Sequence, residues 1–333
     1  MSRKLLSYTA LGLILGNAAI ADVPKVAVDI APVHSLVSRV MEGVGSPKLI
    51  IPAGASPHEY SLRPSEAKSL QDADMVIWMG EDLAPWMENS IEKLAKNAEV
   101  ITVLEASETK LLDFREGALF EEHDHGDHDD HDDHDDHDDH DHDKDHDDHD
   151  DHDDHDDHAG HDHGEHDPHA WLSIENAQTW LNLVAGKLSA ADPENAGVYF
   201  GNAAAARSEI EELSKEVNSI LDPVRGRNFV VFHDAYQYFE TSFDFPASGA
   251  ISLGDATDPS ASRIAEIQGR VREEGINCVL SEPQYNPNLV ETVLEGTDAK
   301  TGVIDPLGVN LEPGPKLYGD LIRNMAKSLA GCL

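Results

Sequence analysis

The feature that most constrains this chain is a run of histidine and acidic residues near its middle. Residues 121–167, the His/Asp tract, contain 16 histidines, 23 aspartates and three glutamates in 47 positions. With almost no apolar side chain to bury and many like charges to separate, the tract cannot build a hydrophobic core. We expect it to be disordered without metal, so the residues on either side must supply the fold.

The spacing of the histidines in the tract predicts metal binding. A solvated acidic linker would explain the aspartates, but it has no use for the histidine at every third position. Neutral imidazole is a common ligand for borderline divalent ions, and carboxylates complete the shell and offset the charge. Each ligand set must order the chain as it binds, so we expect weak sites. The histidines concerned are His123, His125, His128, His131, His134, His137, His140, His142, His146, His149, His152, His155, His158, His161, His163 and His166.

The first 21 residues have the features of a secretory signal peptide. Arg3 and Lys4 precede an apolar stretch, and the segment ends in Ala19-Ile20-Ala21, an A-x-A cleavage site. We therefore expect residues 1–21 to be removed and the mature chain to begin at Asp22. No later segment has the 18 or more apolar residues that a membrane span needs, so the mature protein is predicted to be soluble.

The net charge of the chain indicates which kinds of partner it can bind. The chain carries a formal net charge of −41, of which −25 lies in the tract and −16 elsewhere. Such an acidic protein is a poor partner for nucleic acid and is suited to cation capture.

The two cysteines, Cys278 and Cys332, are an even number in an exported chain, which favours a disulfide; two buried free thiols are the alternative.

Outside the tract, short β-branched runs alternate with amphipathic stretches. Such alternation implies parallel sheets covered by helices. We predict an α/β protein of two lobes, each with a four-stranded, mainly parallel sheet flanked by helices. The predicted strands are 25–30, 48–52, 74–80, 99–104, 227–233, 249–253, 277–281 and 300–304, and the predicted helices include 64–72, 261–274 and 287–296. No Gly-x-Gly-x-x-Gly or phosphate-loop motif follows a predicted strand, which removes the simplest nucleotide-binding interpretations.

A long helix is predicted between the two lobes. Asp192 can cap it, Pro193 suits its first turn, and good helix formers run from Glu194 to Leu221. A helix of this length would span roughly 42 Å and would restrict large hinge closure, although an ordinary surface helix has the same pattern. The predicted organisation is an N-terminal lobe at 22–193, a linker helix at 194–222 and a C-terminal lobe at 223–333.

Four histidines lie outside the tract: His34, His58, His169 and His233. His58 lies in a turn just beyond a predicted strand, and His233 ends the apolar run Phe229-Val-Val-Phe-His. Ligands of open parallel sheets bind at the carboxyl ends of the strands, so these two histidines can face one cleft from opposite lobes. His34 follows the first predicted strand and could reach the same cleft.

Four motifs resemble the metal-binding proteins of zinc and manganese ABC importers. They are Gly54-Ala-Ser-Pro-His-Glu-Tyr-Ser-Leu-Arg-Pro-Ser, Asp167-Pro-His-Ala-Trp-Leu, Val231-Phe-His-Asp-Ala-Tyr and Ser281-Glu-Pro-Gln. The similarity covers essentially all of residues 22–333 and is greatest to the zinc-specific periplasmic (ZnuA-like) type, which often carries a His- and Asp-rich loop. The resemblance implies two lobes joined by a rigid backbone helix, with one metal in the cleft between them.

Carried over by motif, the resemblance implies that His58, His169 and His233 bind the metal. It also implies that Cys278 and Cys332 form a disulfide. Manganese-type relatives usually have a carboxylate at the third histidine position and an aspartate in the loop that follows the Ser-Glu-Pro motif, and this chain has neither. Three imidazoles favour zinc over manganese, but they do not separate zinc from cobalt, nickel or copper.

The fourth ligand is left open by these motifs. Some zinc-type members carry an acid directly before the first histidine, where this chain has Pro57. Water or a nearby carboxylate could fill the position. Glu59 is the nearest carboxylate in sequence, and Glu282 is the second candidate, although a carboxylate at a strand end is as often an ion-pair partner.

We expect a periplasmic, monomeric, non-catalytic protein that captures Zn²⁺ and delivers it to an ABC permease and its ATPase in the inner membrane. The tract would collect or buffer zinc close to His169 at high effective concentration. A secreted zinc-dependent hydrolase is the alternative, since three histidines with an open position also describe catalytic zinc, but no His-Glu-x-x-His signature is present. A binding protein for manganese, nickel or cobalt is another alternative. A zinc buffer alone would explain the tract but not the two lobes.

Overall fold

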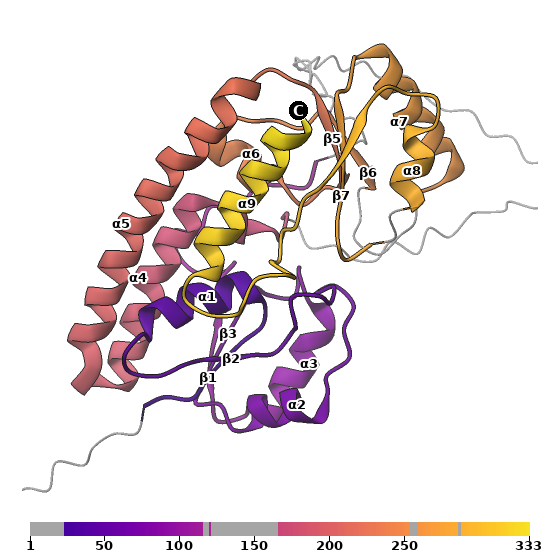
Figure 1. The fold of residues 1–333 in the computed structure, drawn as a ribbon. Helices are drawn as coiled ribbons and strands as arrows, with labels where there is room; N and C mark the ends of the chain where they lie inside the picture. The colour runs from indigo at the N-terminus through magenta and orange to yellow at the C-terminus, as the bar shows by residue number, and fades with distance from the viewer. Residues whose placement is uncertain (1–22, 116–119, 121–165, 253–258, 286–287) are drawn as a thin grey trace, which may run out of the picture.

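The computed structural model describes residues 23–115, 120, 166–252, 259–285 and 288–333. The predicted signal peptide and the tract histidines from His123 to His163 lie outside the described residues. Within them, two four-stranded parallel sheets flanked by helices are joined along one side by long helices (Figure 1). No described helix is long and apolar enough to cross a membrane.

The first lobe contains a sheet of strand order β2-β1-β3-β4. Its strands are β1 (Val26–Val28), β2 (Lys48–Leu49), β3 (Met75–Trp78) and β4 (Glu99–Thr102), and its helices are α1 (Ala31–Val40), α2 (Pro64–Gln71) and α3 (Pro85–Leu94). Every residue of the two central strands is buried, as expected of parallel strands that are covered on both faces. All four strands predicted here are confirmed, with shorter bounds.

The second lobe repeats this order as β6-β5-β7-β8. Its strands are β5 (Phe229–His233), β6 (Ala250–Ser252), β7 (Cys278–Ser281) and β8 (Lys300–Val303), and its helices are α6 (Gln237–Phe243), α7 (Ala261–Glu273) and α8 (Asn288–Leu294). All described pairings in both sheets are parallel. The prediction of two α/β lobes with four strands each is therefore confirmed, whereas the lobe boundaries at 22–193 and 223–333 stay predictions.

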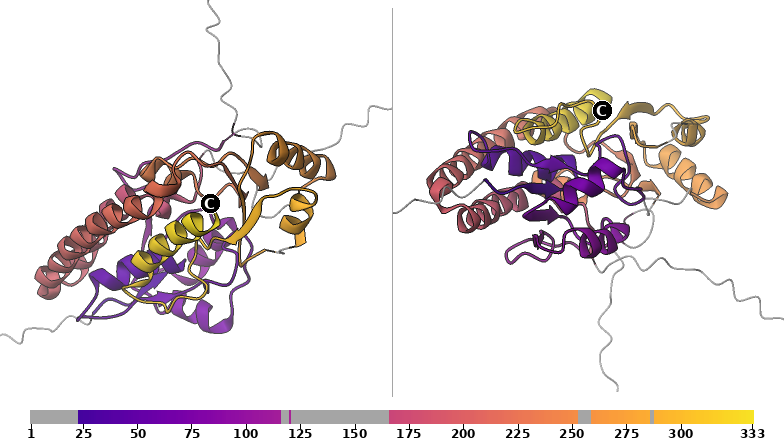
Figure 2. Two further views of the ribbon diagram at one scale, coloured as in Figure 1. Left: turned by 45° about the horizontal axis from the view of Figure 1, so that its top comes forward. Right: turned by 90° about the horizontal axis from the view of Figure 1, so that it is seen from below.

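Two antiparallel helices form the connection between the lobes: α4 (Ile174–Ala191) and α5 (Ala196–Leu221). They run side by side in every view and project away from α7 and α8 (Figure 2). The predicted long helix is confirmed, but its start is corrected. Asp192 closes α4, its carboxylate accepts hydrogen bonds from Asn195 and Tyr199, and a 3₁₀ turn at Pro193–Asn195 separates it from α5. At 26 residues, α5 is about 39 Å long.

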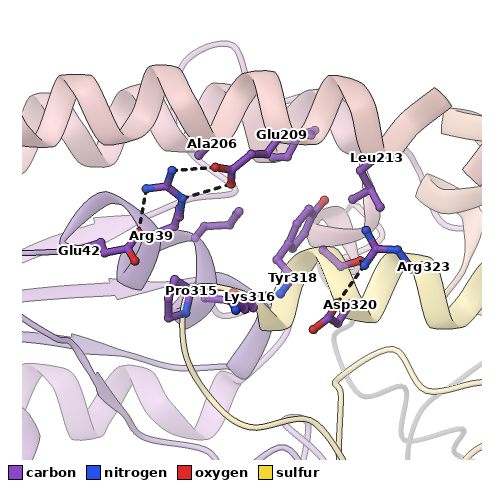
Figure 3. A pocket seen from close by; sticks show the side chains of 14 residues that line it. Arg39, Glu42, Ala206, Glu209, Leu213, Pro315, Lys316, Tyr318, Asp320 and Arg323 are labelled. Atoms are coloured by element: carbon purple, nitrogen blue, oxygen red, sulfur yellow. Dashed lines mark hydrogen bonds and ion pairs between the residues drawn. The ribbon is translucent and has the colours of Figure 1, made fainter. Parts of the chain in front are cut away.

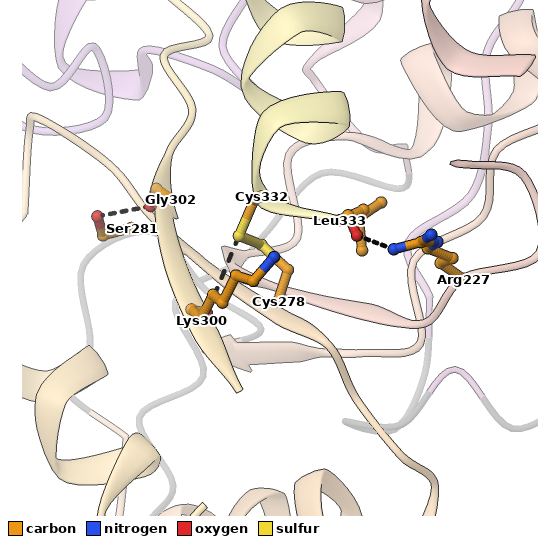
Figure 4. The surroundings of a disulfide bond; sticks show 7 residues. All are labelled: Arg227, Cys278, Ser281, Lys300, Gly302, Cys332 and Leu333. Atoms are coloured by element: carbon orange, nitrogen blue, oxygen red, sulfur yellow. Dashed lines mark hydrogen bonds between the residues drawn. A yellow bond between two sulfur atoms is a disulfide. The ribbon is translucent and has the colours of Figure 1, made fainter. Parts of the chain in front are cut away.

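The last helix, α9 (Leu317–Cys332), crosses from the first lobe to the second. It packs against α1, α5 and β8, and a disulfide links Cys332 at its end to Cys278 in β7, with Cα atoms 5.7 Å apart (Figure 4). The predicted pairing is confirmed and the alternative of two free thiols is wrong. Gly302 in β8 is required here, because a Cβ atom on it would lie 3.1 Å from Cys332 Cβ and 2.9 Å from a methyl of Leu280.

Candidate metal centre

Three histidines from three separate segments converge between the lobes. His58, His169 and His233 each offer one ring nitrogen, and these nitrogens all lie within 4.8 Å of one another. The ring centroid of His169 lies 5.5 Å from that of His58 and 5.3 Å from that of His233. His169 and His233 are buried, and His58 is half-buried. At this spacing, three imidazoles can close on a single ion.

His58 lies on the loop that follows β2, and side chains of α2 and α3 fix this loop. The indole nitrogen of Trp86 donates a hydrogen bond to the carbonyl of Pro57 at 2.8 Å. Tyr60 lies edge-on to Trp86 and donates through its hydroxyl to Glu66 at 2.9 Å. The residues on either side of His58 are therefore both anchored to the first lobe.

His169 is oriented by the carboxylate of Asp167. One oxygen, Oδ1, lies 2.9 Å from the backbone nitrogen of His169 and 2.7 Å from its Nδ1. Asp167 is 1% exposed, so water does not compete for this contact. A ring that donates from Nδ1 to a carboxylate carries its lone pair on Nε2, the atom available to a metal. Asp167 thus fixes the angle of His169.

His233 has an equivalent arrangement. It ends β5, and its Nδ1 lies 2.6 Å from Oε1 of Glu282, which follows β7. Both side chains are almost fully buried. Parallel pairing of β5 with β7 brings the two residues together across 49 positions of sequence. Two buried carboxylates therefore stand directly behind two of the three histidines.

The histidines face a cavity of about 10 Å³, close to the volume of one water-sized sphere. Trp171, Tyr285, Pro306 and Leu307 form much of its remaining wall. Trp171 also donates to the carbonyl of Pro306 at 2.9 Å, which joins this wall across the two lobes. The space has the size of a single ion.

A larger groove of about 430 Å³ lies between α1, α5 and α9 and shares no lining residue with the histidine cavity (Figure 3). Its two arginines are already engaged by acids. Arg39 pairs with Glu42 and Glu209, and Arg323 pairs with Asp320. Among the described residues, the three histidines are the one group of three or more candidate ligands with metal-binding spacing.

The other candidate ligands lie elsewhere or are engaged. His34 is buried in α1, where its Nε2 donates to the carbonyl of Pro47 at 3.2 Å, so the suggestion that it reaches the cleft is wrong. Burial lowers the pKa of His34. Glu59 is exposed and is not among the residues that line the cavity, whereas Glu282 lines it with one oxygen held by His233. His166 pairs with Asp113 at 2.9 Å.

Sequence reasoning missed the role of Asp167. The residue stands in the Asp-Pro-His motif, two positions before a proposed ligand, and that spacing was the available signal. The motif suggested the ligand, and the structure adds the group that orients it.

Comparisons with known proteins agree with this geometry. A family model described as zinc-uptake complex component A, periplasmic, matches residues 26–332. The high-affinity zinc uptake system protein ZnuA of Paracoccus denitrificans (strain Pd 1222) is 47% identical over 331 residues, covering 98% of each chain. Its counterpart from Brucella abortus (strain 2308) is 46% identical over 318 residues, covering 96% of this chain and 94% of that protein.

A solved crystal structure of ZnuA has the same fold. It superposes with a TM-score of 0.71 at 19% sequence identity, covering 93% of this chain and 99% of that one. At that identity the likeness concerns the fold alone. The family model and the two relatives, which extend over nearly the whole sequence, carry the assignment: this chain belongs to the family of the periplasmic zinc-uptake complex component A.

Proposed function

We propose that this protein is a periplasmic solute-binding protein that captures Zn²⁺ and delivers it to an ABC-type permease driven by an ATPase. The observation that carries the proposal is the convergence of His58, His169 and His233 on an ion-sized cavity between two lobes. Membership of the zinc-uptake family and the names of the relatives support the same role. Zinc is the cargo of such a protein, and no reaction is performed on it.

The chemistry of the donors favours a dication of the zinc type. Imidazole suits zinc, whereas manganese and magnesium prefer oxygen ligands. The carboxylates of Asp167 and Glu282 lie one hydrogen bond behind the ligand rings and are buried with them. Two buried negative charges offset the two positive charges of the ion, which lowers the cost of holding it away from water. Cobalt or nickel would fit the same ligands, so availability in the cell completes the selection.

Water is our proposal for the fourth position. Glu59 is exposed and does not line the cavity, and Glu282, whose Oε1 is committed to His233, is not in the group whose ligand atoms lie within 4.8 Å of one another. A tetrahedral ion held by three histidines keeps one open site, which a small molecule of solvent can fill.

A zinc-dependent hydrolase is the second candidate, because an open site on three histidines is also found in catalytic zinc centres. The cavity of about 10 Å³ argues against a hydrolase, because an organic substrate needs a pocket of several hundred Å³. Assays of the zinc-loaded protein with ester, phosphate and peptide substrates should show no metal-dependent turnover. Turnover that disappears in His233→Ala would favour the hydrolase.

Metal titration tests the binding proposal directly. A variant lacking residues 123–166 should bind one zinc tightly in competition with a chromophoric chelator, and elemental analysis should give one zinc per chain. His169→Ala and His233→Ala should each weaken this site by several orders of magnitude. An unchanged dissociation constant in either variant would show that the ligand assignment is wrong.

Delivery and the role of the tract need a cellular measurement. We infer that the tract collects zinc, buffers it and passes it to the cleft, because His169 stands two residues beyond the tract. Cells that lack this protein should regain uptake of radioactive zinc when the full chain is supplied, and no uptake when His233→Ala is supplied. Removal of residues 123–166 should slow loading only when zinc is scarce. Equal rates of zinc loading and equal growth in zinc-poor medium, with and without the tract, would show that the tract has no role in delivery.

A further inference from the structure

A short stem, which we define as residues 112–115 and 166–169, holds together the described segments that precede and follow the central part of the His/Asp tract. The backbone nitrogen of Asp167 donates to the carbonyl of Leu112 at 2.8 Å. One residue further out, Asp113 and His166 form an antiparallel β-bridge, and their side chains meet at 2.9 Å. The stem therefore ends directly at the segment that carries His169.

The hydroxyl of Tyr238 in α6 bridges the two arms of the stem. It accepts a hydrogen bond from the backbone nitrogen of Leu112 and donates one to the carbonyl of Asp167, each at 2.9 Å. Tyr238 is 2% exposed, so no solvent replaces these contacts. A hydroxyl has a single hydrogen to donate, and here it is used on the residue that orients His169.

Three further side chains of the second lobe, those of Gln237, Asp234 and Glu240, hold the stem. Gln237, with its amide turned to use both donors, donates to the Asp113 carbonyl at 3.2 Å and to Oδ2 of Asp167 at 3.1 Å. On the first arm, Arg115 donates to Glu240 at 2.7 Å and also pairs with Asp234, the residue after His233. All three members of this ion cluster are largely buried.

Asp167 is consequently fixed at every polar atom. Its nitrogen and carbonyl are held by the stem and by Tyr238, its Oδ2 by Gln237, and its Oδ1 faces the imidazole of His169. A rotation of Asp167 would turn the carboxylate away from His169 and release the ring from its angle. The anchor of this arrangement is α6, not the segment that contains His169.

We infer that Tyr238 is a positioning residue of the metal centre, which acts through Asp167 to hold His169 at its binding angle. The inference rests on the proposed function, because it requires His169 to be a ligand. The tract that joins the two arms carries a net charge of −25, and this charge changes with every cation it binds. Through Tyr238, the second lobe keeps the angle of His169 independent of those changes.

The test compares Tyr238→Phe with Tyr199→Phe. Both replacements remove one buried hydroxyl, and the Tyr199 hydroxyl donates to Asp192 at 2.8 Å at the junction of α4 and α5. Tyr238→Phe should raise the zinc dissociation constant about tenfold, at the lower end of the effect of losing a group behind a metal ligand. It should also raise the zinc dissociation rate and change the visible absorption spectrum of the Co²⁺-loaded protein. Tyr199→Phe should lower the melting temperature while leaving the affinity and the Co²⁺ spectrum unchanged.

The outcomes separate the inference from the proposed function. If Tyr238→Phe has the zinc affinity and Co²⁺ spectrum of the unchanged protein, Tyr238 has only a structural role and the inference is overturned, while the ligand assignment stands. If His169→Ala binds zinc like the unchanged protein, the proposed function itself fails. Should Tyr238→Phe not fold, Gln237→Ala decides: a weaker zinc site with an altered Co²⁺ spectrum supports the inference, and an unchanged site refutes it.

Discussion

Replacement of Glu282 separates two contributions that a buried carboxylate makes to a metal centre. Its Oε1 lies 2.6 Å from Nδ1 of His233, and the side chains of both residues are almost fully buried. The carboxylate therefore orients the ring and supplies a negative charge that solvent does not screen. Glu282→Gln keeps an acceptor for the ring and removes the charge, whereas Glu282→Ala removes both.

The expected magnitudes follow from this division. Loss of a group behind a metal ligand weakens binding by about 10- to 100-fold, and each factor of ten corresponds to about 1.4 kcal/mol. We expect Glu282→Gln to lie near the lower figure, because the hydrogen bond survives in neutral form. Glu282→Ala should lie near the upper figure, because His233 is then free to rotate in the space left by the side chain.

The assay is competition for zinc against a chromophoric chelator at fixed pH, on protein from which residues 123–166 have been removed. Asp192→Asn is a matched control, because Asp192 is a carboxylate of 0% exposure that binds Asn195 and Tyr199 away from the cleft. It should lower stability and leave the zinc dissociation constant unchanged. Equal affinities for Glu282→Ala and the unchanged protein would refute the reasoning, and so would an equal loss of affinity in Asp192→Asn.

Three further expectations concern ligands, stability and pH. His233→Ala should lose the tight zinc while the weak sites of residues 123–166 persist in the titration; loss of the weak sites alone would contradict the assignment. Replacing Cys278 and Cys332 together by alanine should lower the free energy of unfolding by roughly 4 kcal/mol, from the 54 residues that separate them, and an unchanged denaturation midpoint would contradict this. Burial raises the pKa of Asp29 from 3.8 to about 7, so the folded protein keeps a proton that the unfolded chain has released. The free energy of unfolding should therefore fall as pH rises from about 4 to about 7, and Asp29→Asn should flatten that slope.

The strands were predictable because the signal for them is local. Each is a short run of β-branched or apolar residues between turn residues, and all eight were found. α4 was missed although its buried positions recur at helical spacing, at Ala177, Trp180, Leu181, Val184 and Leu188. The Asp192-Pro193 pair, which marks a helix start, was assigned to the long helix alone, while the same pair also marks the end of the preceding one.

The convergence of the three candidate histidines could be predicted for a different reason, and their role as ligands stays a prediction. His58 lies on the loop after β2 and His233 ends β5, and the rule that sites form at the carboxyl ends of parallel strands places them together without knowledge of the contacts. No comparable rule predicts which residues orient the candidate ligands through hydrogen bonds. Tyr238 meets Leu112 across 126 positions of sequence, and nothing in either local sequence indicates the pairing. Motif and topology therefore predict the candidate ligands, whereas the residues that orient them depend on tertiary packing.

The origin of the three histidines in separate parts of the chain gives the ion a mechanical effect. On one side of the cleft, α4, α5 and α9 tie the lobes together permanently. On the other side, an ion bound to His58 and His233 would act as a removable cross-link between segments 175 positions apart in sequence. A loaded molecule thus has one more tie between its lobes than an empty one. The stiffness of the connection between the lobes would therefore depend on whether the ion is bound.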